Sequence, residues 1–279
     1  MDLEIYTALL TPIFEGKIDY VSLKNVLKRQ SRSKVRGVVA LGTTAEATLL
    51  SDYQKRKILQ VVGDNVGDKT LVVGVGTPST KTTVKNAVVA DKMGASALLV
   101  TTPYFSKYTK DGLIAHFRAI SEATSLPLWV YDVPQRSGIE LTTELAETLF
   151  EMTNVVAVKE AANDKRKVKR LAKTVPNVYG GCDELAKFYT KTNVRGIVSV
   201  TSNLCPQVAA NLSDKENMRL FCNLSRLLKC EVSPVAAKYV AAKTGLIKSA
   251  EAMLPLGALK DGKREDLNEF LQKYGGKLL

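Results

Sequence analysis

The sequence predicts one closed barrel of eight parallel strands, each followed by a helix, with further helices packed against it at the C-terminal end. Eight apolar runs of strand length alternate with stretches that have helical spacing. The runs are almost continuously apolar, which is typical of parallel strands buried on both faces. No G-x-G-x-x-G follows the first run, so a doubly wound nucleotide-binding sheet is less favoured. Together these observations indicate a (β/α)8, or TIM, barrel.

The predicted elements follow one another with short connections. The strand-like runs occupy residues 5–12, 37–42, 70–76, 97–101, 126–133, 155–161, 177–182 and 196–200. The helical stretches between them occupy residues 19–33, 51–62, 80–93, 111–123, 142–150, 164–174 and 184–190. Ser51 opens one of these stretches, and we expect its hydroxyl to cap that helix by accepting a backbone N–H.

The barrel is expected to take up residues 1–206, and residues 207–279 are expected to form a helical extension packed on it. Residues 235–244 and 263–274 have helical spacing within this extension. No stretch rich in Pro, Gly and Ser separates the two parts, so the extension is not expected to be an independent domain. A length of 279 residues suits one large barrel, although two smaller domains would also fit it.

The composition is that of an ordinary soluble globular protein, with 45% hydrophobic and 24% charged residues. No run of about 18 apolar residues occurs, so no membrane-spanning helix is expected. The opening Met1-Asp2-Leu3-Glu4 is acidic and leads at once into a strand-like run, unlike a signal peptide. A cytoplasmic location is therefore expected.

The formal charge of +12 fits two kinds of partner, nucleic acids and small anions. Cations are concentrated at residues 28–36 and 165–173, but both runs lie in helical stretches, where a solvated polar face is the usual explanation. There is no zinc-finger pattern and no RNP-like aromatic motif. We therefore expect no nucleic-acid partner and a field that favours small anionic substrates.

Cysteine and histidine are too sparse for a zinc site. No C-x-x-C pair occurs, and His116, expected on a helix face, is the only histidine. The chain has four cysteines, which we expect to be reduced and mostly buried: Cys182, Cys205, Cys222 and Cys230. No metal is expected, and any mechanism that needs a histidine base must use His116.

Lys159 is the strongest catalytic candidate. It ends the run Val155-Val156-Ala157-Val158, in which three of the four apolar residues are β-branched, as in a strand buried on both faces. Desolvation disfavours the charged form of a lysine, and a neutral amine in a dry pocket can form a Schiff base with a carbonyl. A surface lysine just past a strand, with its head in water, is the alternative.

Other chemically useful side chains follow the neighbouring strands, and barrel enzymes carry their chemistry at the carboxyl ends of the strands. These residues are Thr43, Thr44, Tyr104, Tyr131 and Arg136. Each has an ordinary alternative explanation, as a helix cap, a core aromatic or a surface ion pair. Their joint position at one mouth of the barrel favours the nucleophilic interpretation of Lys159.

Three motifs carry a resemblance to a known family. G-T-T-x-E at residues 42–46, Y-x-V-P-x-R-x-G at residues 131–138 and V-K-E-A at residues 158–161 resemble the dihydrodipicolinate synthase (4-hydroxy-tetrahydrodipicolinate synthase) family in order and spacing. The likeness runs from Thr7 into residues 254–256 and so covers most of the chain. The arginine of the second motif favours this family over the sialic-acid lyases, which are otherwise similar.

The resemblance implies a reaction and roles for seven residues. Pyruvate would form an imine with a lysine and then, as an enamine, add to aspartate 4-semialdehyde, without a metal or organic cofactor. The implied catalytic residues are the nucleophile Lys159, the proton shuttle Tyr131 and the relay residue Thr43. The implied substrate-binding residues are Thr44 for the pyruvate carboxylate, Arg136 for that of the aldehyde, and Gly181 and Val198 as close backbone approaches. A homodimer or homotetramer is also implied.

The chain departs from the family pattern at several positions. Phe105 stands where the family commonly has a second tyrosine that reaches into the neighbouring subunit's site, and Tyr108 or a water could take over its relay role. Ala45 replaces a usual glycine, Asp132 replaces asparagine, and residues 162–163 are Ala-Asn. Two alternatives therefore stay open: a lyase acting on a 2-keto-3-deoxy sugar acid or sialic acid, and a barrel that binds ligands without catalysis.

Regulation by lysine is not expected. In lysine-inhibited relatives the inhibitor sits near the loops after strands two and three. The corresponding positions here are Ala47, Thr48, Asp52, Lys55, Pro78 and Thr82. The Lys55 ammonium would repel the ligand's own ammonium groups, so we expect negligible inhibition.

Overall fold

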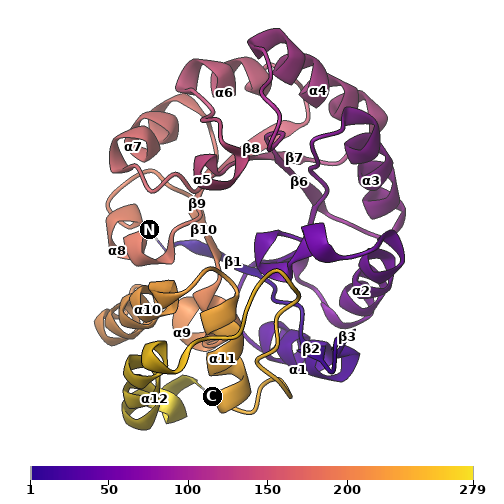
Figure 1. The fold of residues 1–279 in the computed structure, drawn as a ribbon. Helices are drawn as coiled ribbons and strands as arrows, with labels where there is room; N and C mark the ends of the chain where they lie inside the picture. Colours follow the sequence, from indigo (N-terminus) through magenta and orange to yellow (C-terminus); the bar gives the residue numbers. More distant parts are fainter. Residues whose placement is uncertain (1, 279) are drawn as a thin grey trace.

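Eight parallel strands close into a barrel in the computed structural model, which describes residues 2–278. The strands follow the order β1-β10-β9-β8-β7-β6-β5-β4 around the barrel, so neighbours are consecutive barrel strands and the last strand, β10, closes the barrel against β1 (Figure 1). They are β1 (Glu4–Ala8), β4 (Gly37–Ala40), β5 (Thr70–Gly74), β6 (Ala97–Thr101), β7 (Leu128–Asp132), β8 (Val155–Glu160), β9 (Val178–Gly180) and β10 (Gly196–Ser199). The predicted barrel class is confirmed.

Several strands are shorter than the apolar runs that predicted them. The first run continues to Pro12, whereas β1 ends at Ala8, although Leu9 and Leu10 are fully packed in the core. The apolar pattern reports burial, and burial continues after the chain has left the strand ladder. A short antiparallel hairpin, β2 (Ile13–Phe14) with β3 (Lys17–Ile18), follows β1 and was not predicted.

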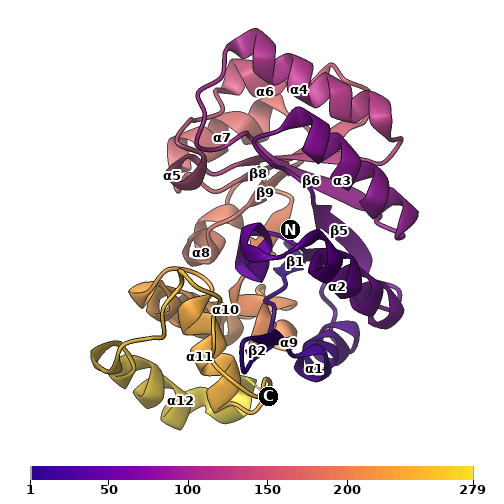
Figure 2. The same cartoon turned by 45° about the vertical axis from the view of Figure 1, so that its right-hand side comes forward.

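A ring of helices surrounds the strands (Figures 1 and 2). They are α1 (Tyr20–Ser31), α2 (Asp52–Asn65), α3 (Thr80–Lys92), α4 (Lys110–Ala123), α6 (Thr143–Phe150), α7 (Lys165–Thr174) and α8 (Ala186–Tyr189), while the short α5 (Pro134–Ser137) lies inside this ring. Ser51 caps α2 as predicted, because its hydroxyl accepts the Gln54 N–H at 3.2 Å while the Gln54 side chain accepts the Ser51 N–H at 2.8 Å. The stretch at residues 184–190 is split into a 3-10 turn (Asp183–Leu185) and α8.

The remaining helices gather on one side of the barrel, next to α1 and α8 (Figures 1 and 2). They are α9 (Pro206–Ala209), α10 (Lys215–Leu227), α11 (Val235–Lys243) and α12 (Glu265–Leu278). The buried residues of α10 and α11 are mostly apolar, and these helices share one hydrophobic core with the barrel's outer layer. The predicted helical extension is therefore present, while its division from the barrel after residue 206 stays a prediction.

A second, smaller core fills the inside of the barrel. Trp129 stacks on Tyr179 with ring centroids 4.3 Å apart, and the edge of Tyr6 meets both rings. Tyr131 lies two residues beyond Trp129 on β7, so it points to the same interior one layer nearer the carboxyl ends of the strands. The aromatic layer thus forms a floor, and the side chains above it face the open mouth.

His116 takes no part in this interior. It lies on α4 as expected, buried, with Nδ1 2.9 Å from the Thr80 hydroxyl, and burial lowers its pKa. All four cysteines are free; only Cys205 is fully buried, so the expectation that most are buried was wrong. No cluster of three or more potential metal-ligating side chains occurs within residues 2–278. Of the helices described, none combines the length and apolarity that a membrane crossing needs.

Candidate active site

Lys159 lies inside the barrel near the carboxyl end of β8. Residues alternate across a strand, so Ala157 and Lys159 face the interior while Val158 and Glu160 face the helices. The side chain is largely shielded, since the residue is 7% exposed. Its ammonium nitrogen lies 4.0 Å from the centroid of the Tyr131 ring, because the two residues are paired in register across β7 and β8. This arrangement contradicts the alternative of a surface lysine.

Thr43 and Thr44 form a tight turn directly after β4. The 3-10 turn Thr43–Ala45 is closed by hydrogen bonds from the Ala45 and Glu46 N–H groups to the carbonyls of Gly42 and Thr43. The hydroxyl of Thr11 donates to the Ala45 carbonyl at 2.9 Å and ties the turn to the chain after β1. The turn is therefore held from inside the protein.

Arg136 lies on α5, the short helix after β7. Asp132, at the end of β7, fixes the segment that contains α5. One of its carboxylate oxygens accepts the Leu141 N–H at 3.1 Å, beyond α5, and the other pairs with the Lys167 ammonium. Lys167 also contacts Glu140 at 2.9 Å. Burial opposes the charge of Lys167, but the hydrogen bonds and charges of the two carboxylates prevail and raise its pKa. Lys167 is thus a buried exception in a basic run that was predicted to be a solvated face.

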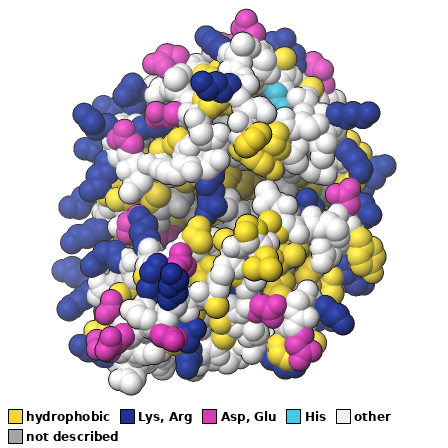
Figure 3. All heavy atoms as spheres, viewed as in Figure 1, with side chains coloured by type: hydrophobic (Ala, Val, Ile, Leu, Met, Phe, Trp, Pro, Cys, Tyr) yellow, Lys and Arg dark blue, Asp and Glu magenta, His cyan; other side chains and the backbone are white. Residues whose placement is uncertain are grey.

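A cavity of about 370 Å3 opens at the mouth of the barrel. Its size is typical of a pocket for small molecules. Figure 3 shows hydrophobic side chains around a hollow in this face. Its lining includes three predicted residues, Thr43, Tyr131 and Arg136.

The other four predicted residues lie outside this lining. Lys159 lies behind the Tyr131 ring, and Thr44 is buried within its turn. Gly181 lies against Lys159, since a Cβ there would come within 3.2 Å of the lysine Cε and 2.7 Å of the Ala161 Cβ. Val198 is buried in the barrel interior on β10. Gly181 therefore lies close to the lysine, and the substrate contacts expected for Gly181 and Val198 both stay predictions.

The cavity lining also includes residues to which sequence reasoning gave no catalytic or substrate-binding role. Tyr104, after β6, and Glu46, after β4, line it from the barrel. Ser233, Pro255 and Leu256 line it from the C-terminal part of the chain. The only sequence signal for these three was the family likeness around residues 254–256, which carried no role. The C-terminal extension is thus part of the cavity wall.

The loop after β6 presents Phe105 to the outside. The residue is 98% exposed and has a positive φ of 71°, which is uncommon for a residue with a side chain. Its neighbour Tyr104 lines the cavity, and burial raises the pKa of the Tyr104 phenol. Tyr108 is the proposed substitute for the missing relay tyrosine, but its hydroxyl is buried and does not line the cavity. The geometry therefore argues against Tyr108 in that role, and the water stays a prediction.

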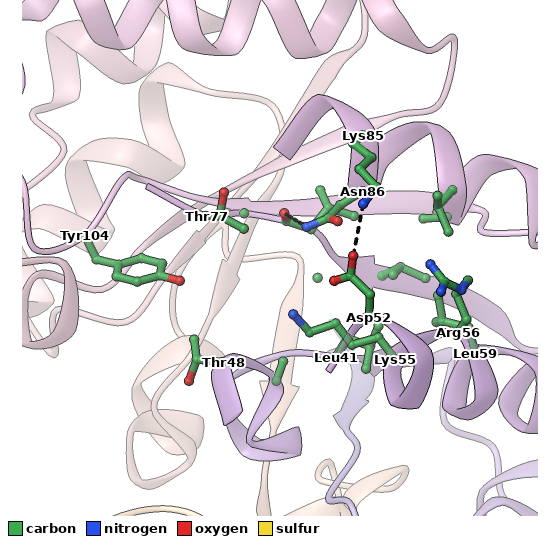
Figure 4. A pocket seen from close by; sticks show the side chains of 17 residues that line it. Leu41, Thr48, Asp52, Lys55, Arg56, Leu59, Thr77, Lys85, Asn86 and Tyr104 are labelled. Carbon is green, nitrogen blue, oxygen red and sulfur yellow. Dashed lines mark hydrogen bonds and ion pairs between the residues drawn. The ribbon is translucent and has the colours of Figure 1, made fainter. Parts of the chain in front are cut away.

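A second cavity, of about 140 Å3, lies between α2, α3 and the ends of β4 and β5 (Figure 4). Lys55, Arg56 and Lys85 line it together with Asp52, which is paired with Lys85 at 3.0 Å. Tyr104 borders both cavities. The cation that was expected to repel a bound lysine is therefore in this second cavity, and negligible inhibition by lysine stays a prediction.

The site combines a shielded primary amine with a phenol beside it and a guanidinium across the cavity. An amine of this kind can add to a ketone and lose water to form an imine. The guanidinium of Arg136 can bind a carboxylate through two parallel hydrogen bonds. The site therefore suits imine chemistry on small substrates that carry carboxylates.

Comparison with known proteins finds relatives that match nearly the whole chain. Residues 2–274 match the Dihydrodipicolinate synthetase family. The 4-hydroxy-tetrahydrodipicolinate synthase of Fervidobacterium nodosum is 32% identical over 96% of this chain and 97% of its own length. That of Coxiella burnetii is 33% identical over 96% of each chain. The crystal structure of the chloride-inhibited dihydrodipicolinate synthase from Acinetobacter baumannii with pyruvate superposes with a TM-score of 0.94, at 30% identity, over 100% of this chain and 99% of the other.

Proposed function

The chain belongs to the dihydrodipicolinate synthetase family, and from this premise we propose that it condenses pyruvate with L-aspartate 4-semialdehyde to give 4-hydroxy-tetrahydrodipicolinate. The enzyme is a lyase of the Schiff-base type. One observation carries the proposal: Lys159 is shielded at the carboxyl end of a barrel strand, with its nitrogen 4.0 Å from the centre of the Tyr131 ring. This position makes Lys159 the proposed nucleophile.

The first half of the reaction is assigned to the inner part of the site. The Lys159 amine adds to the keto carbon of pyruvate, and loss of water leaves a protonated imine. The imine draws electrons from the methyl group, which loses a proton and becomes an enamine carbon. Tyr131 and Thr43, which both line the cavity, move protons in these steps. Thr44 holds the pyruvate carboxylate from its turn at the end of β4.

The second half of the reaction uses the outer part of the cavity. The enamine carbon attacks the aldehyde carbon, and the amino group of the acceptor then displaces Lys159 as the ring closes. Arg136 lines this part of the cavity and binds the acceptor carboxylate. A polyhydroxylated sugar acid would instead require side chains that hydrogen-bond to hydroxyls at the position of Arg136. Arg136 therefore favours the semialdehyde over a sialic-acid-type substrate.

We also propose that the protein forms a homodimer or a homotetramer. Phe105 supports it, because a 98% exposed aromatic ring at the edge of the mouth is suited to burial against another subunit. The cytoplasmic location stays a prediction from the sequence.

Turnover with defined aldehydes tests the proposed substrate. The protein is incubated with pyruvate and, separately, with L-aspartate 4-semialdehyde, D-glyceraldehyde or N-acetylmannosamine, and loss of pyruvate is followed. Of the three aldehydes, we expect only the semialdehyde to cause loss of pyruvate. The Lys159→Arg variant should consume no pyruvate, because its guanidinium stays protonated. Preference for either sugar aldehyde would replace the proposed substrate, and no loss with any aldehyde would favour a non-catalytic binding protein.

A further inference from the structure

Glu46 is a buried charge directly behind the turn that carries Thr43 and Thr44. Its side chain has no exposed surface, and its backbone is left-handed, with φ 57° and ψ 31°. Its N–H donates to the Thr43 carbonyl at 3.0 Å, and its own carbonyl accepts the Leu49 N–H at 2.9 Å. Glu46 therefore joins two successive 3-10 turns, Thr43–Ala45 and Ala47–Leu49, at one strained residue.

The Glu46 side chain reaches into the C-terminal extension. One carboxylate oxygen forms an ion pair with Lys238 of α11, which is also fully buried. The other accepts the Met253 N–H at 2.6 Å. The Lys238 ammonium in turn donates to the Glu251 carbonyl at 2.9 Å. One buried ion pair thus fastens the turn after β4, helix α11 and the segment around residues 251–253 to one another.

All three of these segments meet the catalytic cavity. Thr43 lines it from the turn, Ser233 lines it just before α11, and Pro255 and Leu256 line it just after the segment that Glu46 and Lys238 hold. The pair therefore stands where the barrel and the extension together form one wall.

Stability alone is a weak explanation for this pair. Two charges without exposed surface cost much desolvation energy, and packed apolar residues of similar volume often stabilise a fold equally well. What the charges add is a defined geometry, since the ammonium donates hydrogen bonds, and the carboxylate oxygens accept them, only in particular directions. Burial lowers the pKa of Lys238, although the charge of Glu46 opposes this.

We propose that Glu46 and Lys238 are positioning residues for the reaction: their ion pair fixes the Thr43–Thr44 turn against α11 and residues 251–256. The C-terminal extension then serves catalysis through this contact. The inference rests on the proposed function, because it concerns how the turn binds pyruvate.

The test separates positioning from general stability by using three variants. Lys238→Met removes the ammonium with little change in volume, and Glu46→Gln/Lys238→Met removes both charges while the new amide oxygen can still accept the Met253 N–H. Arg29→Met is the matched control, because Arg29 on α1 donates to the Leu278 carbonyl of the extension, as well as to the Leu204 carbonyl within the barrel, and does not line the cavity. Folding is checked by circular dichroism, and kcat and the pyruvate KM are measured for each folded variant.

A misplaced turn binds pyruvate more weakly, whereas partial unfolding lowers only the concentration of active enzyme. We expect kcat/KM for pyruvate to fall about 10- to 100-fold in Lys238→Met, with a raised KM, and to stay within about twofold in Arg29→Met. If Lys238→Met does not fold, the double variant replaces it, with the same raised KM expected.

Each contrary result has a distinct meaning. An unchanged pyruvate KM in a folded variant without the ion pair would overturn the positioning role, as would an equal rise in Arg29→Met. Borohydride trapping of pyruvate on the wild-type protein is run alongside. Its failure would overturn the proposed function itself, so the two failures can be told apart.

Discussion

The turns after β4 and β7 are held from inside the protein, whereas the loop after β6 is not. Glu46 and Lys238 fasten the first turn, and Asp132, Lys167 and Glu140 fasten the second. In the loop after β6, Phe105 is 98% exposed, and its neighbour Ser106 makes a local backbone bond to the Tyr104 carbonyl. We call the first two the held wall and residues 104–107 the open loop.

The difference matches what each part is proposed to do. The held wall carries Thr43, Thr44 and Arg136, which must meet two carboxylates with defined geometry, and pre-organised groups lose less free energy when they bind. The open loop carries Tyr104, which lines the cavity, and Phe105, whose ring is exposed. Substitutions in the held wall should therefore have large effects, and substitutions in the open loop small ones.

Arg136→Ala should show the largest effect in the held wall. The loss of a bidentate contact to the acceptor carboxylate removes two charge-assisted hydrogen bonds of roughly 1.5–3 kcal/mol each. We expect kcat/KM for the semialdehyde to fall by at least about 100-fold, while pyruvate is still trapped on the enzyme. The neighbouring exposed Gln135, as Gln135→Ala, is the control. If trapping of pyruvate failed as badly as turnover, the role given to Arg136 would be wrong.

Lys167→Met should break the fastening of the second turn. It leaves the buried Asp132 carboxylate without its cation, a change that costs about 3–5 kcal/mol in comparable cases. Urea unfolding should show the loss, and Lys165→Met on the exposed part of the same helix should show almost none. The double variant Asp132→Asn/Lys167→Met should recover much of it. Equal midpoints for the two single variants would contradict a held wall.

Glu160 should make stability depend on pH next to this turn. Burial raises its pKa from 4.5 to about 7; the Ala162 N–H and Lys167 oppose this, and Asp132 and Asp164 add to it. Between about pH 4.5 and pH 7 the Glu160 carboxyl is therefore protonated in the folded protein and ionised in the unfolded chain. Stability should fall by roughly 2–3 kcal/mol as the pH rises through this window, and change no further above it.

Urea unfolding at pH 5 and pH 8 measures this effect. Glu160→Gln, which can still accept the Ala162 N–H, should lack that part of the pH dependence. The same fall in the variant as in the wild type would show that another group is responsible.

Phe105→Tyr should show the smallest effect, because it changes the open loop. A restored phenol would complete the proton relay, and a few-fold rise in kcat is expected. Tyr108→Phe is the control, expected within about twofold because its hydroxyl does not line the cavity. A clear fall in kcat for Tyr108→Phe would instead place that phenol in the relay.

The fold was predictable because the signal was local. Continuous apolar runs such as residues 155–158 report strands buried on both faces, and Ser51 reports a helix start through a hydrogen bond three residues away. The hairpin β2–β3 was missed because its two-residue strands are too short to show a period.

The site was predictable where strand ends placed its residues, and not where its support comes from distant segments. Lys159 and Tyr131 could be found because both end barrel strands. The ion pair between Glu46 and Lys238 could not be predicted from the sequence, because Lys238 lies in a helix far along the chain. Lys167 was hidden in a basic run whose other members are solvated, and Asp132 showed only as a departure from the family's asparagine.

Trapping with borohydride tests the central claim, that Lys159 is the nucleophile, most directly. The protein is mixed with pyruvate, reduced, digested and mapped by mass spectrometry, beside Lys159→Arg and the surface control Lys165→Arg. We predict a reduced pyruvate adduct on the peptide that contains Lys159, in the wild type and in Lys165→Arg, and none in Lys159→Arg. An adduct on another lysine, or no adduct in the wild type, would contradict the account.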